Sequence, residues 1–191
     1  MAVAADIVVE DGTGLDTSNS YVSIADADTY HELRGNAAWT DATQDQKATA
    51  LIHATEYLDM RWTFIGAVTF PGDPTNLAQA LQWPRTDDEF ITDSRGNQYG
   101  DDEIPFWIVN AELEYALAYL TTGRLLPDPT VPDDAGRFVT LKREKLGPLE
   151  EETRFSDSRG TSTSKRTYAL ADKIIRQSGL AVTGGDRAIR A

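Results

Sequence analysis

The stretch 105-PFWIVNAELEYALAYLTTG-123 decides the fold, because it predicts one long helix with two apolar faces. Proline is favoured in the first turn of a helix, and a glycine just past the last turn ends one. One face collects Ile108, Ala111, Tyr115 and Ala118, and a neighbouring face collects Leu113, Leu117 and Leu120. A helix of this length, about 25 Å, with apolar residues on two faces should lie at the centre of the protein and pack on two sides.

Outward from this helix, apolar residues at spacings of three and four predict shorter helices on both sides. Ser23 is a suitable N-cap for the first of them, Thr40 opens the second, Pro84 ends a one- or two-turn helix that begins at Leu77, and Gly179 ends the last. The expected helices span 24–34, 41–61, 77–83 and 167–178, and residues 6–22 form an extended arm that ends in a loop.

Residues 137–157 predict a β-hairpin whose two strands carry opposite charge. Apolar residues alternate before and after the bend at 146-LGPL-149, which is the period of a strand. The first strand holds Lys142, Arg143 and Lys145, and the second holds Glu150, Glu151 and Glu152. Lys145 can face Glu150 or Glu151, and Arg143 can face Glu152, depending on the register. Because a lone two-stranded hairpin is marginal in water, we expect it to pack on its own helices or on a neighbouring copy.

The predicted fold class is therefore mainly α: a small helical bundle with a protruding β-hairpin and extended N- and C-terminal segments. We expect a single domain in which residues 1–136 form the helical body with its N-terminal arm. Residues 137–157 form the hairpin, and residues 158–191 form a linker, the C-terminal helix and a tail.

The charge is divided unevenly along the chain, whose formal net charge is -13. Residues up to Gly136 include 24 acidic and 6 basic residues, whereas residues from Arg137 onward include 7 acidic and 12 basic ones. The basic third suits a negative partner, either nucleic acid or the body of another copy, although an uneven solvated surface would look the same.

The residue types for catalysis and metal binding are sparse. The chain has no cysteine, its only histidines are His31 and His53 on separate predicted helices, and neither a P-loop nor a nucleophile elbow is present. The acidic runs 87–89 and 101–103 could ligate calcium or magnesium, but their spacing does not match an EF-hand. We therefore expect no enzymatic activity, no cofactor and no catalytic or metal site. The absence of a long apolar run predicts a soluble protein with no membrane partner.

Binding of single-stranded nucleic acid needs basic side chains interleaved with aromatic ones. The aromatic residues between 57 and 70 lie in a strongly acidic part of the chain, so we expect them in the core. Phosphate contacts would then come from the last third, which supplies Lys142, Arg143, Lys145, Lys165 and Arg166.

Five segments taken together resemble the head-to-tail adaptor proteins of tailed phages, a family whose members are also labelled "putative DnaT-like single-stranded DNA-binding protein". They are 8-VVEDGTGLDTSNSYVSIADADTYHELRGNAAW-39, 48-ATALIHATEYLD-59, 79-QALQWPR-85, 123-GRLLPD-128 and 142-KREKLGPLEEE-152. The sequence departs from the family pattern between Arg61 and Arg85, where it has no lysine or arginine. A DNA-facing role for that stretch is therefore in doubt.

The resemblance implies a virion structural protein of the neck, made in the cytoplasm of a bacterial host. About twelve copies would form a ring that joins the portal protein to a tail or neck protein and surrounds the channel through which the double-stranded genome passes, without sequence-specific binding. Opposite charges on one subunit suit the head-to-tail contacts of such a ring. The alternative is a DnaT-like single-stranded DNA-binding protein.

Two sets of site residues follow from the adaptor hypothesis. The hairpin interface between subunits would use Lys142, Arg143, Lys145, Glu150, Glu151, Glu152 and Phe155. The portal-binding tail would use Ile174, Ile175, Leu180, Val182, Arg187 and Arg190.

Overall fold

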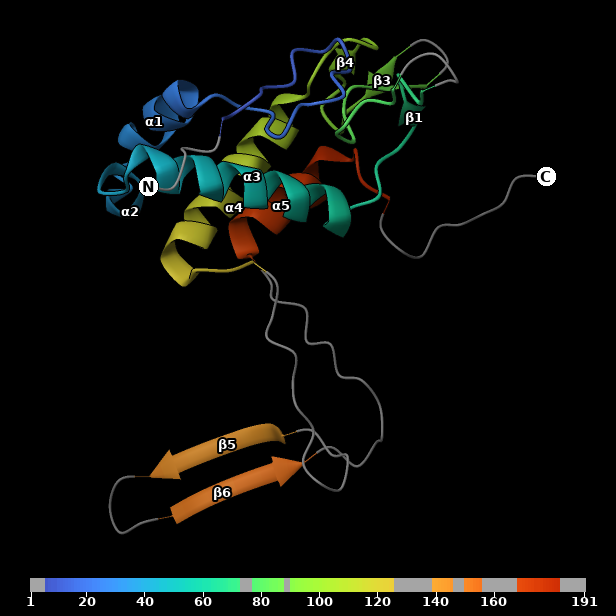
Figure 1. The fold of residues 1–191 in the computed structure, drawn as a ribbon. Helices are drawn as coiled ribbons and strands as arrows, with labels where there is room; N and C mark the ends of the chain where they lie inside the picture. Colours follow the sequence, from blue (N-terminus) through green and yellow to red (C-terminus); the bar gives the residue numbers. More distant parts are fainter. Residues whose placement is uncertain are drawn as a thin grey trace, which may run out of the picture. The chain divides into compact units, whose positions relative to one another are not determined.

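The computed structural model describes residues 6–72, 77–87, 90–125, 139–145, 150–155 and 168–182. The chain divides into two compact units, a helical unit of residues 1–125 with 167–191 and a hairpin unit of residues 126–166. Helices dominate and the strands pair only as short two-stranded sheets, which confirms the mainly α fold class (Figure 1). Within the described ranges, no helix combines the length and the apolar character that a membrane crossing requires.

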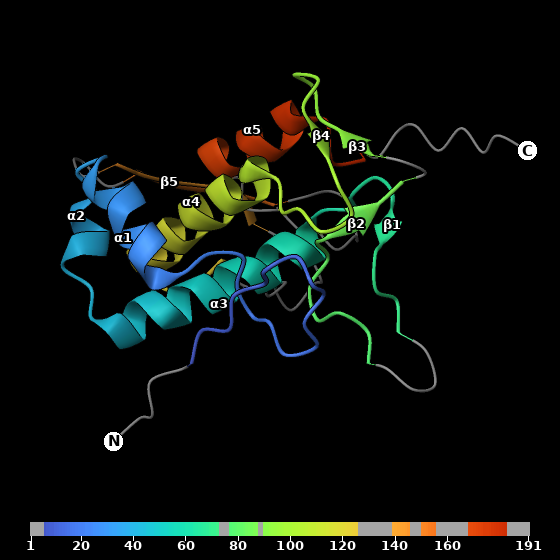
Figure 2. The ribbon, with the colours of Figure 1, turned by 90° about the horizontal axis from the view of Figure 1, so that it is seen from above.

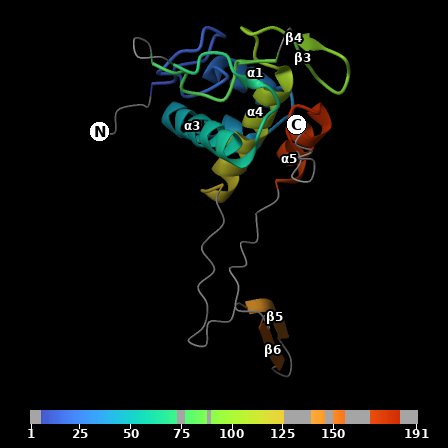
Figure 3. The same cartoon turned by 90° about the vertical axis from the view of Figure 1, so that its right-hand side faces the viewer.

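The central helix is α4, Phe106–Thr122, which lies between α3, Gln44–Arg61, and α5, Ala169–Ser178 (Figures 2 and 3). This arrangement confirms the expected helix with two packed faces. The three helices share one core, whose fully buried side chains include Leu51, Leu58, Ile108, Tyr115 and Ile175. Gly123 ends α4 in the left-handed conformation, and Gly179 ends α5 in the same way, as their positions in the sequence predict.

The region before α3 corrects one prediction, because the helix expected over 41–61 starts three residues later and a separate short helix precedes it. After α1, Ile24–Glu32, a short α2 spans Ala37–Thr40, and α3 begins only at Gln44. Thr43 forms a capping box with Gln46, in which each side chain accepts a hydrogen bond from the other residue's backbone N–H at 3.3 and 2.9 Å. The break inserts the buried Trp39 under α1, where its Nε1 donates to Asp28 at 2.7 Å.

The helix expected over 77–83 is absent. The backbone N–H of Gln79 donates to Phe70 and that of Ala80 donates to Leu15, so these donors serve neighbouring loops instead of a helix. The side chain of Gln79 also binds the carbonyls of Leu81 and Pro84 at 2.7 and 3.0 Å.

Three short antiparallel sheets complete the described structure. In the helical unit, β1, Ala67–Val68, pairs with β2, Arg85–Thr86, and β3, Ile91–Thr92, pairs with β4, Gln98–Tyr99.

The predicted hairpin is present in the second unit. Its strands are β5, Val139–Lys145, and β6, Glu150–Phe155, and their register aligns Arg143 with Glu152 and Lys145 with Glu150. The register therefore selects Glu150 over Glu151 as the residue opposite Lys145.

Residues 6–22 form the expected extended arm, and Glu10 shapes its first loop. The buried Glu10 carboxylate accepts hydrogen bonds from the backbone N–H groups of Gly12, Gly14 and Leu15 at 2.9–3.0 Å and from the hydroxyl of Ser18 at 2.9 Å. The N–H groups of both glycines in the Gly-Thr-Gly run thus donate to Glu10, and that of Thr13 donates to Asp11 at 3.0 Å.

Glu112, in the middle of α4, holds the end of the arm. Its fully buried carboxyl lies 2.6 Å from the Ser20 hydroxyl, 2.9 Å from the Thr55 hydroxyl and 3.0 Å from the backbone N–H of Tyr21. The other end of Tyr21 is also fixed, because its hydroxyl donates to Asp59 at 2.8 Å. Burial raises the pKa of Glu112 to about 8 and that of Asp59 to about 6.

Candidate nucleic-acid interface

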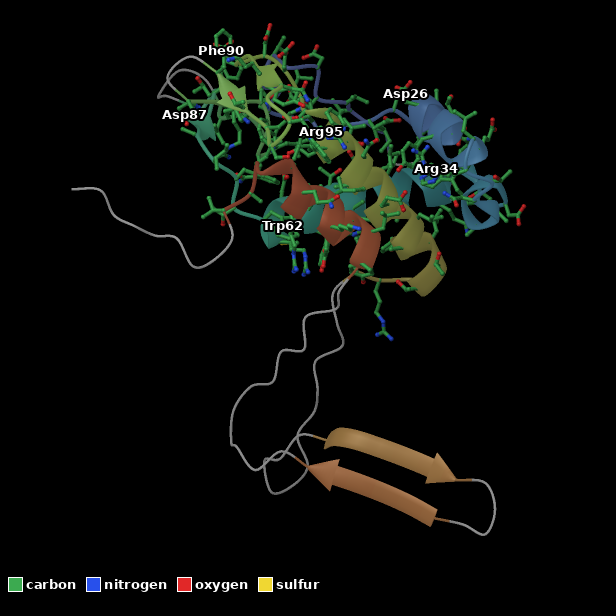
Figure 4. The ribbon with its side chains drawn as sticks, turned by 180° about the vertical axis from the view of Figure 1, so that it is seen from behind. Asp26, Arg34, Trp62, Asp87, Phe90 and Arg95 are labelled. Carbon is green, nitrogen blue, oxygen red and sulfur yellow. The ribbon has the colours of Figure 1, made fainter. Side chains whose placement is uncertain are left out.

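The cationic side chains of the helical unit gather around α5. Among its described residues, Lys47 and Arg85 are buried and Arg34 lies in the turn after α1. The remaining cations flank α5 or lie on it: Arg61, Arg95, Arg124, Lys173 and Arg176. Figure 4 shows Trp62 and Arg95 on either side of α5 in this view, with Arg34 apart from it. We call Arg61, Trp62, Arg95, Lys173 and Arg176 the α5 face.

Trp62 is the aromatic centre of the α5 face. It follows the last residue of α3 and is partly exposed. The guanidinium groups of Arg61 and Arg176 lie over its ring, 5.4 and 5.9 Å from the ring centroid. Its Nε1 donates to the hydroxyl of Tyr115 at 3.0 Å, which fixes the orientation of the ring. A partly exposed indole beside the exposed Arg176 can stack on a base while that arginine meets a phosphate.

A buried ion pair holds α5 against α3 beneath this surface. Arg61 donates to Asp172 at 2.6 Å, and Asp172 also accepts a hydrogen bond from Tyr115 at 2.7 Å. Asp172 is the only carboxylate on α5 and is 2 % exposed, so α5 presents no exposed negative charge. Burial, together with the hydrogen bond to Asp172, raises the pKa of Tyr115 well above its usual range.

The turn between β3 and β4 brings the cation of Arg95 toward the C-terminal end of α5, where the neighbouring Ser94 bonds to Ser178. Asp93 accepts hydrogen bonds from the backbone N–H groups of Arg95 and Asn97 at 2.8 and 2.9 Å and from Trp107 Nε1 at 2.7 Å. Burial works against the ionised form of Asp93, but the hydrogen bonds from Trp107 and Asn97 outweigh it and hold its pKa below the ordinary value. This rigid turn places the Arg95 guanidinium 4.4 Å from the Trp107 ring centroid and 5.8 Å from that of the half-exposed Phe106.

The two histidines lie outside the α5 face. His31 is buried beside Trp39, and burial lowers its pKa to about 4, so it is neutral at physiological pH. His53 stacks on Tyr119 and lies 3.4 Å from Glu56. In the part of the chain that the structure describes, no group of three or more potential metal ligands comes together.

The predicted hairpin residues lie together on β5 and β6, as the register requires. Their proposed role in a subunit interface stays a prediction. Phosphate contacts were expected from Lys142, Arg143 and Lys145 on β5, and Lys165 and Arg166 lie outside the described residues.

The predicted portal-binding tail is divided by the structure. Ile175 and Leu180 are fully buried in the helical unit, Ile174 is partly buried and Val182 is 39 % exposed. Arg187 and Arg190 lie outside the described residues. A portal contact by Ile175 or Leu180 would require residues 168–182 to leave their present position, and the assignment stays a prediction.

The α5 face itself was not anticipated from the sequence. Trp62 was expected in the core, and Arg61, Arg95 and Arg176 are separated by more than thirty residues each. The only local signal was the turn chemistry of 93-DSRGN-97, which correctly indicates a turn but not what its arginine contacts.

A protein-family model described as "Putative DnaT-like ssDNA binding protein" matches residues 5–191. No curated protein matches the chain, and no solved structure does. The description agrees with the alternative that the sequence left open and says nothing of a phage adaptor.

Proposed function

Since the chain belongs to the family described as putative DnaT-like ssDNA binding proteins, we propose that it binds single-stranded DNA on the α5 face. The observation that carries the proposal is the partly exposed Trp62 with the guanidinium groups of Arg61 and Arg176 over its ring, in a helical unit whose net charge is -13. Stacking on Trp62 would hold a base, and Lys173, Arg176 and Arg95 would contact phosphates along the strand.

The net charge of -13 limits the affinity but does not prevent local binding. Exposed charges farther away than the Debye length, about 8–10 Å at physiological salt, are largely screened. With three exposed cations on the α5 face, Arg95, Lys173 and Arg176, the slope of log K against log salt should be about -2 for a single strand. Affinity should then fall roughly twentyfold between 50 and 200 mM salt.

The test is a fluorescence-anisotropy titration of a labelled oligothymidylate at several salt concentrations. Lys173→Ala and Arg176→Ala should each weaken binding and reduce the salt slope by about 0.7. Trp62→Ala should weaken binding at least about fivefold, because stacking contributes about 1–3 kcal/mol per base, with little change in the slope. Arg34→Ala is the matched control, since Arg34 is an exposed arginine in the turn after α1, apart from the α5 face. Equal effects of the Arg34 and Arg176 substitutions would refute the assignment.

The second candidate is the phage head-to-tail adaptor, and the division of charge between the two units favours it. Residues 126–166 contain eight acidic and eight basic residues, so the entire net charge of -13 belongs to the helical unit. Acidic walls would let duplex DNA pass without adhering to them, because like charges repel. A hairpin with one basic and one acidic strand offers two unlike surfaces for head-to-tail contacts in a ring.

Mass measurement separates the two candidates. An adaptor should form a ring of about twelve copies, alone or on purified portal rings, and should bind oligonucleotides weakly. A chain truncated after Val182 tests the tail. It keeps the buried Leu180 and removes Arg187 and Arg190, which lie outside the described residues. The ring hypothesis fails if the protein stays monomeric with portal present and captures single strands at micromolar concentration.

A further inference from the structure

Residues 168–182 dock on the helical unit as a bound peptide would. They hold α5 and the three residues after its terminal glycine, and residues 126–167 separate them from the rest of that unit. Their apolar side chains Ala171, Ile175 and Leu180 are at most 1 % exposed. An amphipathic helix laid on an apolar surface is a common mode of peptide recognition.

The end of the segment adds a second mode, the pairing of a short strand. Ala181 forms an antiparallel bridge with Phe64. The backbone N–H of Ile65 donates to Leu180 at 2.9 Å, and that of Val182 donates to Thr63 at 2.7 Å. Main-chain pairing of this kind supplies affinity that depends little on the side chains.

Polar contacts fix the register of this docking. The buried carboxylate of Asp172 accepts a hydrogen bond from Arg61 at 2.6 Å and one from Tyr115 at 2.7 Å. At the other end of α5, the backbone N–H of Ser94 donates to the carbonyl of Ser178 at 2.7 Å. We call the surface formed by α3, α4, residues 63–65 and Ser94 the α3–α4 surface. It recognises this segment by shape, charge and main-chain pairing together.

From these contacts we propose that the α3–α4 surface is a docking site for residues 168–182 of a second copy, so that copies join by exchanging this segment. The same contacts form whether the segment comes from its own chain or another. The stretch 126–138 can span up to about 45 Å and 156–167 a similar distance, which is enough to reach a neighbouring copy. The covalent connection gives the chain's own segment an effective concentration of roughly millimolar, so exchange competes with docking within the chain where copies are held at comparable concentration. The proposal is independent of DNA binding.

Cysteine cross-linking tests the exchange cleanly, because the chain contains no cysteine. A Cβ added to Gly179 would lie 3.4 Å from the Cβ of Ser94, close to the separation found in disulfides. Ser94→Cys and Gly179→Cys chains are purified separately, mixed at millimolar concentration and oxidised. We expect at least tenfold more of the mixed disulfide dimer than from Leu33→Cys mixed with Gly179→Cys, since Leu33, the C-cap residue of α1, is 81 % exposed and reports random collision.

The double variant with both cysteines in one chain measures docking within the chain. If it cross-links internally while the mixture gives no more dimer than the Leu33 control, the exchange proposal is overturned.

A charge-reversal experiment covers the case in which cysteine at Gly179, whose φ is +73°, disturbs the fold. Arg61→Asp and Asp172→Arg each place like charges together within one chain. When the two variants are mixed, reciprocal exchange restores an opposite pair in both docking sites. We expect a heterodimer by size exclusion with light scattering only in the mixture, while a chain carrying both substitutions docks its own segment. Two variants that remain separate on mixing contradict the proposal.

Discussion

Replacing Glu112 by glutamine should stabilise the protein and remove much of the pH dependence of its stability. The hydroxyl of Ser20 lies 2.8 Å from the carbonyl of Val22, and that of Thr55 lies 3.0 Å from the carbonyl of Leu51. Each hydroxyl has one proton, so once these carbonyls are satisfied neither can donate to Glu112. A proton on Glu112 would instead donate to the Ser20 oxygen, which lies at a short 2.6 Å.

A glutamine completes this set of hydrogen bonds without a titrating group. Its two N–H donors match the hydroxyl oxygens of Ser20 and Thr55, and its carbonyl accepts the backbone N–H of Tyr21. The carboxyl of Glu112, in contrast, must be kept protonated in the folded protein above its ordinary pKa of 4.5. At pH 7 this costs on the order of 3 kcal/mol, and above pH 8 the cost levels off at roughly 5 kcal/mol.

The sign follows from proton uptake. Because the folded pKa of Glu112 is raised to about 8, the folded state binds more protons than the unfolded state between pH 4.5 and 8. The wild-type free energy of unfolding should therefore fall across this window, and Asp59, with its pKa raised to about 6, adds to the loss at the acidic end.

Urea denaturation followed by circular dichroism between pH 5 and 9 measures the effect. Glu112→Gln should gain up to about 3 kcal/mol at pH 7 and show a flatter pH profile. Glu114→Gln is the control on the same helix, at a partly exposed site bonded to Tyr30, and should keep the wild-type profile. The reasoning is refuted if Glu112→Gln is less stable than the wild type at pH 8 or keeps its pH slope.

Three further substitutions test other parts of the fold by the same denaturation assay. Thr43→Ala removes the capping box of α3 and should lower the free energy of unfolding by about 1 kcal/mol; no loss would mean that the cap is unimportant. Asp172→Asn leaves the charge of Arg61 buried without its partner and should cost about 3 kcal/mol, whereas a loss below 1 kcal/mol would contradict a buried pair. Gly14→Ala combines a φ of +71° with a Cβ that collides with the Phe70 ring, so it should unfold at clearly lower urea, and an unchanged midpoint would show that this loop can shift.

The sequence predicted the elements whose signals are local. The two apolar faces of α4, the glycines after α4 and α5, and the alternating strands of the hairpin each depend on residues within one element. Predictions failed where the local pattern was ambiguous. A helical pattern over 77–83 gave way to loop contacts of Gln79, and the helix expected from residue 41 begins at Gln44, after its capping residue Thr43.

The candidate site could not be predicted because its members are distant in sequence. Arg61 and Trp62 end α3, Arg95 occupies a turn, and Lys173 and Arg176 lie on α5. Only the packing of α5 on α4 makes them one surface, and in the linear sequence they are isolated cations in an acidic chain.

By itself, the sequence determined a mainly α protein with a charged hairpin and an acidic helical body, because periodicity, caps and net charge are properties of neighbouring residues. The tertiary structure decided which polar groups are buried and which cations share a surface. Burial of Glu112 and the gathering of charge at Trp62 depend on contacts between segments about fifty or more residues apart, and those contacts exist only after the helices have packed.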